Sequence, residues 1–214
     1  MKKGVIFDLD GTLLHSLPDI AAAMNRALTR YGLPTFEENA YKYKVGNGVL
    51  KLTERVIGER ADLYDQVKTA YMADYARNNR ISTRPFRDIP ELLKELIRRG
   101  IPVCVLTNKD QSDAENMLAY YFPDIAFSVI RGRVEGVPLK PNPAGALLIA
   151  ESLSVSPADC LYVGDTGTDM SCGSAAGMET VGVLWGYRPR EELTANGARH
   201  LISEPMELLR LAEA

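Results

Sequence analysis

The sequence predicts an α/β protein whose core is a doubly wound, Rossmann-like parallel sheet carrying an inserted all-helical cap domain. Short apolar runs alternate with segments of helical periodicity, which is typical of a parallel sheet covered by helices. Several of these runs are followed directly by acidic or phosphate-binding residue types. About 95 residues separate Phe7 from Val103, whereas a connection between a strand and a helix usually takes about two to six residues. This interval therefore predicts an insertion.

Five apolar runs are predicted to be the strands of the sheet: residues 5–7, 103–106, 127–130, 160–163 and 180–184. Four segments between or after them are predicted to be helices: residues 88–99, 110–121, 143–153 and 169–176. In the first of these helices the apolar residues recur at helical spacing, and Gly100 follows as a typical C-terminal stop. Residues 204–214 predict a short amphipathic helix at the end of the core.

The insertion has two helical patterns of its own, at residues 17–31 and 61–78. We therefore predict an α/β core made of residues 1–14 and 85–214, and a helical cap made of residues 15–84.

The chain is expected to pass between core and cap at residues 14–16 and 82–85. Within the cap, Tyr71 and Tyr75 are four residues apart on one predicted helix, so we expect their rings to pack together.

The composition narrows the classes of function. The 214 residues carry a formal net charge of -3, and the sequence shows no run of Lys and Arg, so we expect no general attraction to nucleic acid. No apolar stretch reaches the roughly 18 residues that a membrane span needs. The start, MKKGVIFDLDGT, has no small-residue cleavage site, so we expect a mature protein that begins near Met1 and is cytoplasmic.

The three cysteines, Cys104, Cys160 and Cys172, are far apart and lack the spacing of a metal site or a disulfide framework. We expect Cys104 and Cys160 to act as small hydrophobic residues within strands. Cys172 lies close to an acidic motif, and packing is again the expected role.

Polar residues follow the predicted strands at the points where those strands end. In a parallel sheet these ends lie at one edge, so residues distant in sequence converge there. The motif DLDGTL places Asp8 and Asp10 after the first strand, and Thr107-Asn108-Lys109 follows the second. GDTGTD, with Asp165 and Asp169, follows the fourth strand, and Lys140 stands before a helix in LKPNP.

Each of these residue types meets a need of phosphoryl transfer, which depends mainly on positioning and electrostatics. A carboxylate such as that of Asp8 can be the nucleophile, and Mg²⁺ can be held by hard oxygen ligands such as Asp8 and Asp165. Asp10 can act as general acid and then as general base. Thr107 offers a hydroxyl to phosphate oxygens, and Lys140 offers an ammonium.

Taken singly, each motif has an ordinary structural explanation. Asp and Gly after a strand usually form a turn, and Thr168 or Asp165 could simply cap the following helix. Thr107 could likewise be a helix cap, and Lys140 could be a solvated surface residue. The occurrence of four such motifs in one order, each near a strand end of the same sheet, favours the chemical interpretation.

These motifs make the chain resemble the haloacid dehalogenase superfamily, in the branch with a helical cap inserted after the first strand. The resemblance extends over nearly the whole chain. DLDGTL resembles the first motif of the superfamily and implies Asp8 as nucleophile. It also implies Asp10 as acid and base, with its backbone carbonyl on Mg²⁺.

The other three motifs carry further implications of the same resemblance. LTN resembles the second motif and implies phosphate binding by Thr107 and Asn108. LKPNP resembles the third and implies that Lys140 neutralises the phosphate and the nucleophile. GDTGTD resembles the fourth, with Asp165 as a metal ligand and Asp169 behind the direct ligands.

Two further features bear on the subclass. An aspartate at position 10 is kept by the phosphatases and phosphomutases of the superfamily and not by its dehalogenases or ion-pumping ATPases. The cap segment Gly46-Asn47-Gly48 is similar to that of bacterial phosphoglycolate phosphatases, where backbone amides could recognise a small anion. An ordinary turn between helices explains this segment equally well.

His15 and residues 85–87 depart from the sequence pattern of these phosphatases. Both lie near the points where the chain passes between core and cap, so the departures concern cap closure and substrate fit.

The leading hypothesis is thus a Mg²⁺-dependent phosphatase acting on a small phosphorylated metabolite, with 2-phosphoglycolate as the best single guess. Pyrophosphate and nucleotide monophosphates are further candidate substrates. A phosphomutase resembling β-phosphoglucomutase, a binding protein that has lost activity and a phospho-accepting signalling domain are the alternatives. The signalling domain is disfavoured because its acidic pair and phosphorylated aspartate lie on different strands and it has no cap. The sequence does not indicate the oligomeric state.

Overall fold

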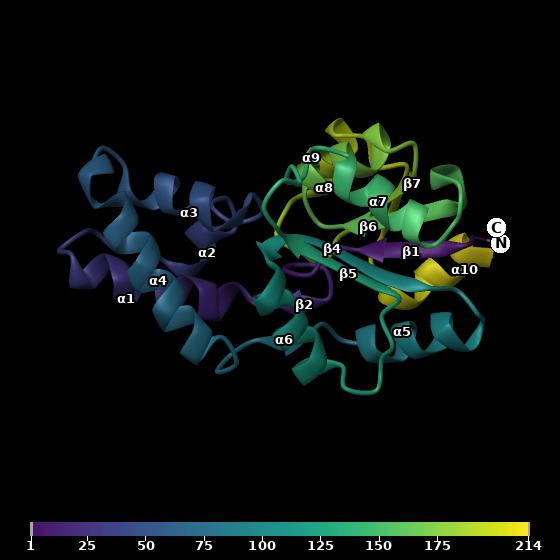
Figure 1. Cartoon of the computed structure of the whole chain (residues 1–214), viewed down its shortest axis with the longest axis horizontal. Coiled ribbons are helices and arrows are strands. Elements are labelled where there is room, and N and C mark those ends of the chain that lie inside the picture. The colour runs from purple at the N-terminus through teal and green to yellow at the C-terminus, as the bar shows by residue number, and fades with distance from the viewer. Residues whose placement is uncertain (1, 214) are drawn as a thin grey trace. The chain divides into compact units, whose positions relative to one another are not determined.

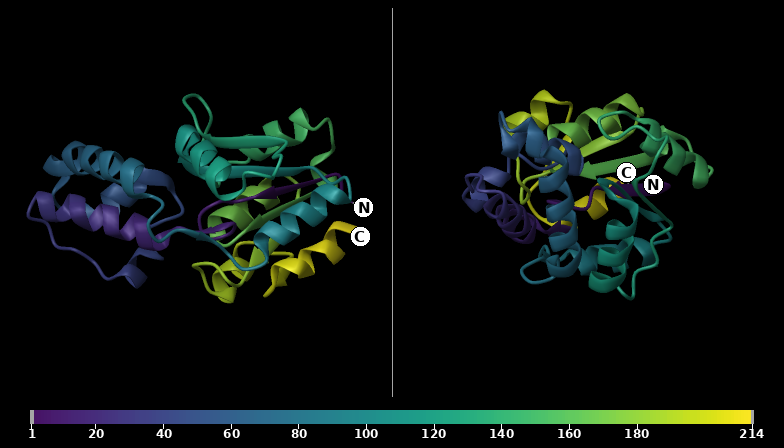
Figure 2. Two further views of the ribbon diagram at one scale, coloured as in Figure 1. Left: turned by 90° about the horizontal axis from the view of Figure 1, so that it is seen from below. Right: turned by 60° about the vertical axis from the view of Figure 1, so that its left-hand side comes forward.

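The computed structural model describes residues 2–213 and divides into two compact units (Figure 1). The core unit comprises the chain up to Leu14 and from Pro85 onward, and the cap unit comprises His15–Arg84. These bounds coincide with those that the sequence predicts for core and cap. In the core unit, Figures 1 and 2 show the two ends of the chain side by side, and the backbone amide of Lys2 donates to the Ala212 carbonyl at 2.8 Å.

The core unit is built on one six-stranded sheet with the order β5-β4-β1-β6-β7-β8. Its strands are β1 (Gly4–Phe7), β4 (Val103–Asp110), β5 (Val129–Arg133), β6 (Cys160–Gly164), β7 (Glu179–Val183) and β8 (His200–Ile202). All neighbouring strands are parallel. The chain leaves β1 toward β4 and β5 on one side and later returns to β6, β7 and β8 on the other. The point where the strand order reverses therefore lies at β1, where open α/β sheets usually bind their ligands.

Helices cover both faces of this sheet because alternate residues of the central strand point to opposite sides. Val5 and Phe7 pack with α5 (Ile89–Arg98), α6 (Gln111–Tyr121) and α10 (Leu208–Glu213). Ile6 packs on the other face with α7 (Ala144–Ser152) and α8 (Gly167–Ala175). A short helix, α9 (Arg190–Ala195), and the 3₁₀ turns η2 (Pro157–Asp159) and η3 (Pro205–Glu207) complete the unit.

Several element bounds differ from the prediction. β4 continues through Asp110, so Thr107, Asn108 and Lys109 lie within the strand rather than after it. β5 begins at Val129 rather than at Phe127. α8 begins at Gly167 because Thr166 caps it, accepting a hydrogen bond from the Asp169 amide. The strand β8 and the helix α9 were not predicted, and the predicted helix over 204–214 begins with η3, with Ala214 outside the described residues.

The cap unit consists of helices, as predicted: α1 (Leu17–Arg30), α2 (Glu38–Tyr41), α3 (Gly48–Ile57), the turn η1 (Ala61–Leu63) and α4 (Tyr64–Asn78). α1 packs along α4. The helices α1 and α4 were predicted from the sequence, and α2 and α3 were not. The Tyr71 and Tyr75 rings stack with centroids 5.5 Å apart and planes at 19°, which confirms the predicted packing pair. Two short strands, β2 (Leu14–His15) and β3 (Arg84–Pro85), form a small sheet where the chain changes units.

Asp19 ties the two ends of the cap unit together. Its carboxylate is buried and accepts hydrogen bonds from the Ser82 amide at 2.9 Å, the Thr83 amide at 2.8 Å and the Thr83 hydroxyl at 2.8 Å. The first turn of α1 is thereby fixed to the segment that leaves α4. Because charged acceptors make strong hydrogen bonds and unpaired buried donors are costly, this carboxylate contributes substantially to the cap's stability.

Asp19→Ala is therefore expected to lower the free energy of unfolding of the cap by about 2–4 kcal/mol, since it leaves buried donors without acceptors. Urea unfolding followed by circular dichroism measures the change. The matched control is Asp65→Ala, because Asp65 lies on the same unit with its side chain 83% exposed and pairs only across one helical turn with Lys68. Equal, small effects of the two substitutions would contradict the role given to Asp19.

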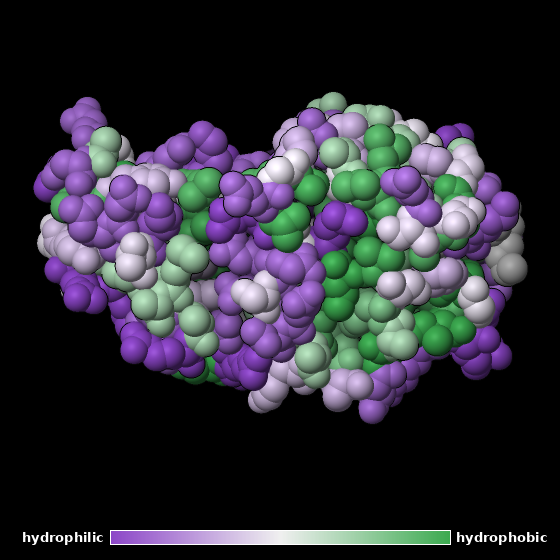
Figure 3. All heavy atoms as spheres, viewed as in Figure 1, coloured by the Kyte–Doolittle hydropathy of each residue, from purple (hydrophilic) through white to green (hydrophobic). Residues whose placement is uncertain are grey.

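None of the described helices combines the length and apolarity needed to cross a bilayer. Large exposed apolar side chains are scattered over both units, and Figure 3 shows hydrophobic residues interspersed with hydrophilic ones on the face seen in Figure 1. The three cysteines are free and buried, as predicted for small packing residues. Burial raises the pKa of the Cys104 thiol to about 12 and that of Cys172 to about 11.

Candidate active site

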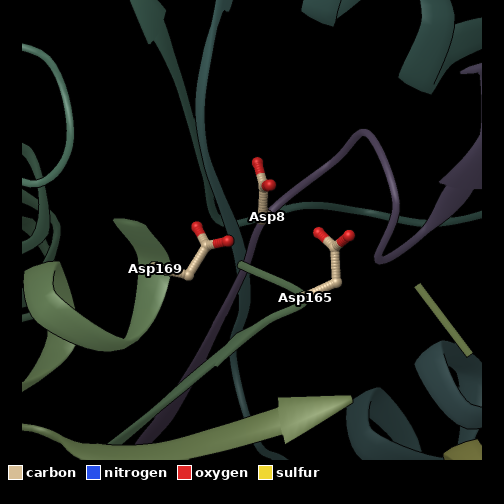
Figure 4. A group of neighbouring side chains, drawn as sticks. All are labelled: Asp8, Asp165 and Asp169. Atoms are coloured by element: carbon tan, nitrogen blue, oxygen red, sulfur yellow. The ribbon is translucent and has the colours of Figure 1, made fainter. Parts of the chain in front are cut away.

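Three acidic side chains meet at the carboxyl ends of β1 and β6, where the strand order reverses. The Asp8, Asp165 and Asp169 carboxylates each place one oxygen within 4.8 Å of the others, and all three residues are buried. Figure 4 shows the three carboxyl groups gathered at this end of the strands. Asp8 continues β1, and its amide donates to the Val163 carbonyl at 2.9 Å. The sheet thus sets the position of the acid that follows its central strand.

The turn after Asp8 depends on a glycine. Gly11 has φ +93°, and a Cβ at this position would lie 2.3 Å from an oxygen of Asp165. Only glycine satisfies both the backbone conformation and the close approach. Gly11 of the DLDGTL motif therefore allows Asp165 of the GDTGTD motif to lie directly against this turn.

Backbone and hydroxyl donors orient the two acids of the GDTGTD motif. The Tyr187 amide donates to Asp165 Oδ2 at 2.8 Å, and the Thr12 hydroxyl lies 3.3 Å from Asp165 Oδ1. The Thr166 amide donates to Asp169 Oδ2 at 3.1 Å, which completes the capping box of α8, and the Thr166 hydroxyl donates to the same oxygen at 2.6 Å. Asp169 thus takes part in the capping box of α8 and also contributes a carboxylate to the acidic cluster.

Lys140 is the cation of this cluster. Its Nζ lies 2.8 Å from Asp8 Oδ1 and 2.7 Å from Asp169 Oδ1, and its side chain is only 2% exposed. The Asn108 side chain holds the Lys140 backbone, since its Oδ1 accepts from the Lys140 amide at 2.9 Å and its Nδ2 donates to the carbonyl at 3.1 Å. The proposal that Asn108 binds phosphate stays a prediction, and positioning Lys140 is a role that the sequence did not indicate.

The electrostatics of the cluster are set by burial and by the proximity of like charges. Burial, with Asp169 adding repulsion and Lys140 opposing both, raises the pKa of Asp8 to about 7. Burial and the neighbouring Asp169 and Asp8 hold the pKa of Asp165 well above its ordinary value. Burial by itself lowers the pKa of Lys140, but Asp169 and Asp8 outweigh it and keep that pKa above its usual range. Strongly shifted groups of this kind are typical of functional sites.

Asp10 lies at the more open side of the cluster and has a lysine of its own. Its Oδ2 is 2.8 Å from Lys109 Nζ, and the two side chains are 19% and 8% exposed respectively. Thr107, also predicted in the site, is 3% exposed, and its hydroxyl accepts a hydrogen bond from the Lys109 amide at 3.2 Å. The structure therefore brings Asp8, Asp10, Thr107, Asn108, Lys140, Asp165 and Asp169 to one edge of the sheet.

A family model described as haloacid dehalogenase-like hydrolase matches residues 2–177. The chain belongs to this hydrolase family. The match covers DLDGTL, LTN, LKPNP and GDTGTD, on which the resemblance to the superfamily was based.

Curated relatives and a solved structure agree with this assignment. The chain is 32% identical over 196 residues to a phosphoglycolate phosphatase of Pectobacterium atrosepticum, covering 89% of this chain and 84% of the relative. It is 31% identical over 210 residues to a phosphoglycolate phosphatase of Aquifex aeolicus, covering 98% and 96%. A crystal structure from Lactobacillus delbrueckii subsp. bulgaricus superposes with a TM-score of 0.93 at 26% identity, covering 99% of each chain. The fold and the enzyme class are those predicted.

The donor set of this hydrolase fits a hard divalent cation such as Mg²⁺. Three carboxylates and one ammonium leave the cluster with a net charge of -2 when all four groups are ionised. Carboxylate oxygens are the ligands that Mg²⁺ prefers. Both oxygens of Asp169 accept hydrogen bonds, from Lys140 and Thr166, and both oxygens of Asp165 accept from the Tyr187 amide and the Thr12 hydroxyl, so these contacts do not rank the carboxylates as ligands. The assignment of Asp8 and Asp165 as direct ligands, with Asp169 behind them, stays a prediction.

Mg²⁺ is expected to stabilise the protein more strongly as the pH rises. Since the pKa of Asp8 is raised from 3.8 to about 7, the folded state binds more protons than the unfolded state between these values. Without the ion, this group makes the free energy of unfolding fall as pH rises through that window. A bound cation takes the place of the proton and restores the lost stability. At a cation concentration one hundred times Kd, binding adds about 2.7 kcal/mol to the free energy of unfolding.

Thermal unfolding at pH 5 and pH 8, with MgCl₂ or NaCl at equal ionic strength, measures this effect. The MgCl₂-dependent rise in Tm should be larger at pH 8 and should disappear in Asp165→Asn. An equal rise at both pH values, or a rise that survives the substitution, would contradict the assignment of Mg²⁺ to this cluster.

The cap residues of the predicted site form a turn between α2 and α3. Gly46 and Gly48 have φ values of +104° and +78°, a backbone conformation that favours glycine. Asn47 Oδ1 accepts a hydrogen bond at 2.7 Å from Arg55, whose guanidinium also donates to the Lys44 carbonyl at 2.7 Å. The turn is therefore held by α3 itself. Substrate recognition by Gly46, Asn47 and Gly48 stays a prediction.

Proposed function

We propose that this chain is a Mg²⁺-dependent phosphatase that hydrolyses a small phosphate monoester, with 2-phosphoglycolate as the substrate, through an aspartyl-phosphate on Asp8. The observation that carries the proposal is the position of the Asp8 carboxylate. It lies at the switch point of the sheet, 2.8 Å from the Lys140 ammonium, with a second, more exposed acid two residues further along.

In the first half of the reaction, an Asp8 carboxylate oxygen forms a bond to phosphorus while the bond from phosphorus to the ester oxygen breaks. Asp10, in its protonated form, gives its proton to that leaving oxygen. Lys140 and the Thr107 hydroxyl bind phosphate oxygens and neutralise the charge that develops on them. Mg²⁺, held by Asp8 and Asp165 with the Asp10 carbonyl, would further neutralise the phosphate.

In the second half, Asp10 takes a proton from a water molecule whose oxygen bonds to phosphorus. The bond from phosphorus to Asp8 then breaks and frees the carboxylate. Because one residue donates the proton and later accepts one, Asp10 returns to its starting state and each cycle releases one alcohol and one inorganic phosphate.

The choice of 2-phosphoglycolate is supported by the relatives named phosphoglycolate phosphatase, which align over most of the chain. The Gly46-Asn47-Gly48 turn agrees with a small anionic substrate, since backbone amides in turns with positive φ can bind anions.

Release of inorganic phosphate from a panel of phosphate esters, with Mg²⁺ or with excess EDTA, tests the proposal. The panel includes 2-phosphoglycolate, ethyl phosphate, glucose 6-phosphate, a nucleoside monophosphate and pyrophosphate. We expect the highest kcat/KM for 2-phosphoglycolate and no turnover with EDTA. Turnover that persists in EDTA contradicts the Mg²⁺ requirement, and preference for another compound corrects the substrate. Transfer of the phosphoryl group to sugar without release of phosphate would indicate a phosphomutase.

A further inference from the structure

Lys109 is a charged residue at the heart of the site to which the phosphatase mechanism gives no task. Its ammonium is almost fully covered, with 8% of the side chain exposed, and lies 2.8 Å from Asp10 Oδ2. Covering a lysine in this way is unfavourable unless its charge is matched, and Asp10 provides the match. The two acids of the DLDGTL motif thus contact different lysines, Asp8 through Lys140 and Asp10 through Lys109.

A distortion of β4 aims Lys109 at Asp10. Leu106 pairs with Arg131 and Asp110 pairs with Arg133, so β4 advances four residues while β5 advances two. The extra residues form an irregularity at positions 107–109, and such bulges commonly turn side chains toward a site. The segment is fixed at its start by the Thr107 hydroxyl, which accepts the hydrogen bond of the Lys109 amide.

A glycine on the neighbouring strand makes this distortion feasible. A Cβ at Gly132 would lie 2.8 Å from the Lys109 carbonyl oxygen and 2.7 Å from Gln111 Cα, closer than real side chains come. Gln111 Oε1 also accepts a hydrogen bond from the Gly132 amide at 2.5 Å. The backbone around Lys109 is therefore fixed by Thr107 of β4 and by the close approach of Gly132 of β5.

We propose that Lys109 is a positioning residue that holds the Asp10 carboxyl group in the orientation from which it exchanges protons with the leaving group and the water. Engaging Oδ2 fixes the rotation of the carboxyl group and leaves Oδ1 for the reacting oxygen. This inference rests on the proposed function. Asp113 on α6 is a second acid close enough for Lys109 to lower its pKa against the effect of burial, and it has no task in the mechanism.

The leaving group distinguishes this role from a general contribution to the fold. An alkoxide leaves phosphorus poorly unless it is protonated, whereas acetate leaves acetyl phosphate as a stable anion. The ratio kcat/KM reports the steps up to phosphorylation of Asp8. Misplacing Asp10 should therefore lower kcat/KM for ethyl phosphate and leave that for acetyl phosphate nearly unchanged.

The experiment compares Lys109→Met, Lys109→Arg and two controls, Lys94→Met on the exposed side of α5 and Asp113→Asn. In Lys109→Met we expect kcat/KM for ethyl phosphate to fall by about 10- to 100-fold and that for acetyl phosphate by less than about 3-fold. Lys109→Arg should recover part of the loss, and both controls should behave as the parent enzyme does.

Three outcomes would overturn the inference. Equal losses on ethyl and acetyl phosphate would show a structural role. A loss confined to 2-phosphoglycolate and expressed in KM would show that Lys109 binds the substrate's second anionic group instead. An undiminished effect of Lys109→Met on ethyl phosphate in an Asp10→Asn background would show that Lys109 does not act through Asp10. None of these results affects the proposed function, which is decided by the parent enzyme and by Asp8→Asn.

Discussion

Asp8→Asn is expected to lower kcat for phosphate ester hydrolysis by about four to six powers of ten, the scale at which loss of a nucleophile is felt in enzymes with covalent intermediates. The amide has nearly the shape of the carboxyl group but is a far poorer nucleophile. Phosphate release under steady-state conditions measures the loss. The control is Asp65→Asn on the exposed side of α4, which should leave kcat unchanged.

The same substitution should not weaken the fold. Asp8 is one of three buried carboxylates and shares the Lys140 ammonium with Asp169, and burial with the repulsion of Asp169 raises its pKa to about 7. Removing this charge relieves repulsion above pH 7, so we expect the Tm in EDTA to stay equal or to rise. An inactive but stable variant is typical of a site that sacrifices stability for function. A variant that keeps more than about one hundredth of the parent kcat would exclude Asp8 as the nucleophile.

Lys140→Met is expected to be damaging to both activity and stability. The ammonium lies 2.8 Å from Asp8 and 2.7 Å from Asp169, and its loss leaves buried carboxylates without their ion pair. Breaking a buried pair by removing one partner costs about 3–5 kcal/mol. Loss of a preorganised charge at the phosphate should also lower kcat/KM by about 10²- to 10³-fold.

The stability loss in Lys140→Met should depend on pH in a definite direction. Without the ammonium the carboxylates gain protons more readily in the folded state, so the folded protein is favoured at low pH and loses stability as pH rises. Urea unfolding in EDTA at pH 5 and pH 8 should show a larger deficit at pH 8, compared with the exposed control Lys94→Met. A deficit that is the same at both pH values would argue against Lys140 as the partner of these acids.

The parts of the fold that the sequence predicts well are those in which local pattern and burial agree. β1, the first four residues of β4 and most of β6 are apolar runs buried on both faces, and α5 carries its apolar residues at helical spacing. β8 has only three residues, His200–Ile202, which is too short for a pattern, and its pairing with β7 is a tertiary property. The helix α3 follows a turn with two glycines, where local preference gives no clear start.

The site shows the same division between local and tertiary information. Asp8, Asp10, Asp165, Lys140 and Thr107 stand in local motifs near strand ends, so their convergence follows from a parallel sheet. Contacts across the chain escaped prediction: Asn108 holding the Lys140 backbone, and Lys109 pairing with Asp10. Lys109 stands two residues after Thr107, but the strand irregularity that turns it toward Asp10 requires the register of β5. Thr166, rather than Thr168 or Asp165, caps α8, because its hydroxyl accepts from the Asp169 amide while the Asp169 carboxylate accepts from the Thr166 amide.

The most direct test of the central claim is to trap the phosphoryl group on Asp8. The enzyme is mixed with radiolabelled ester and Mg²⁺, quenched in acid within a single turnover, digested and mapped. We predict label on the peptide that contains Asp8, removed by hydroxylamine as expected for an acyl phosphate, and absent in Asp8→Asn. Hydrolysis at the full rate with no label on that peptide, or with label on another residue, would contradict the account.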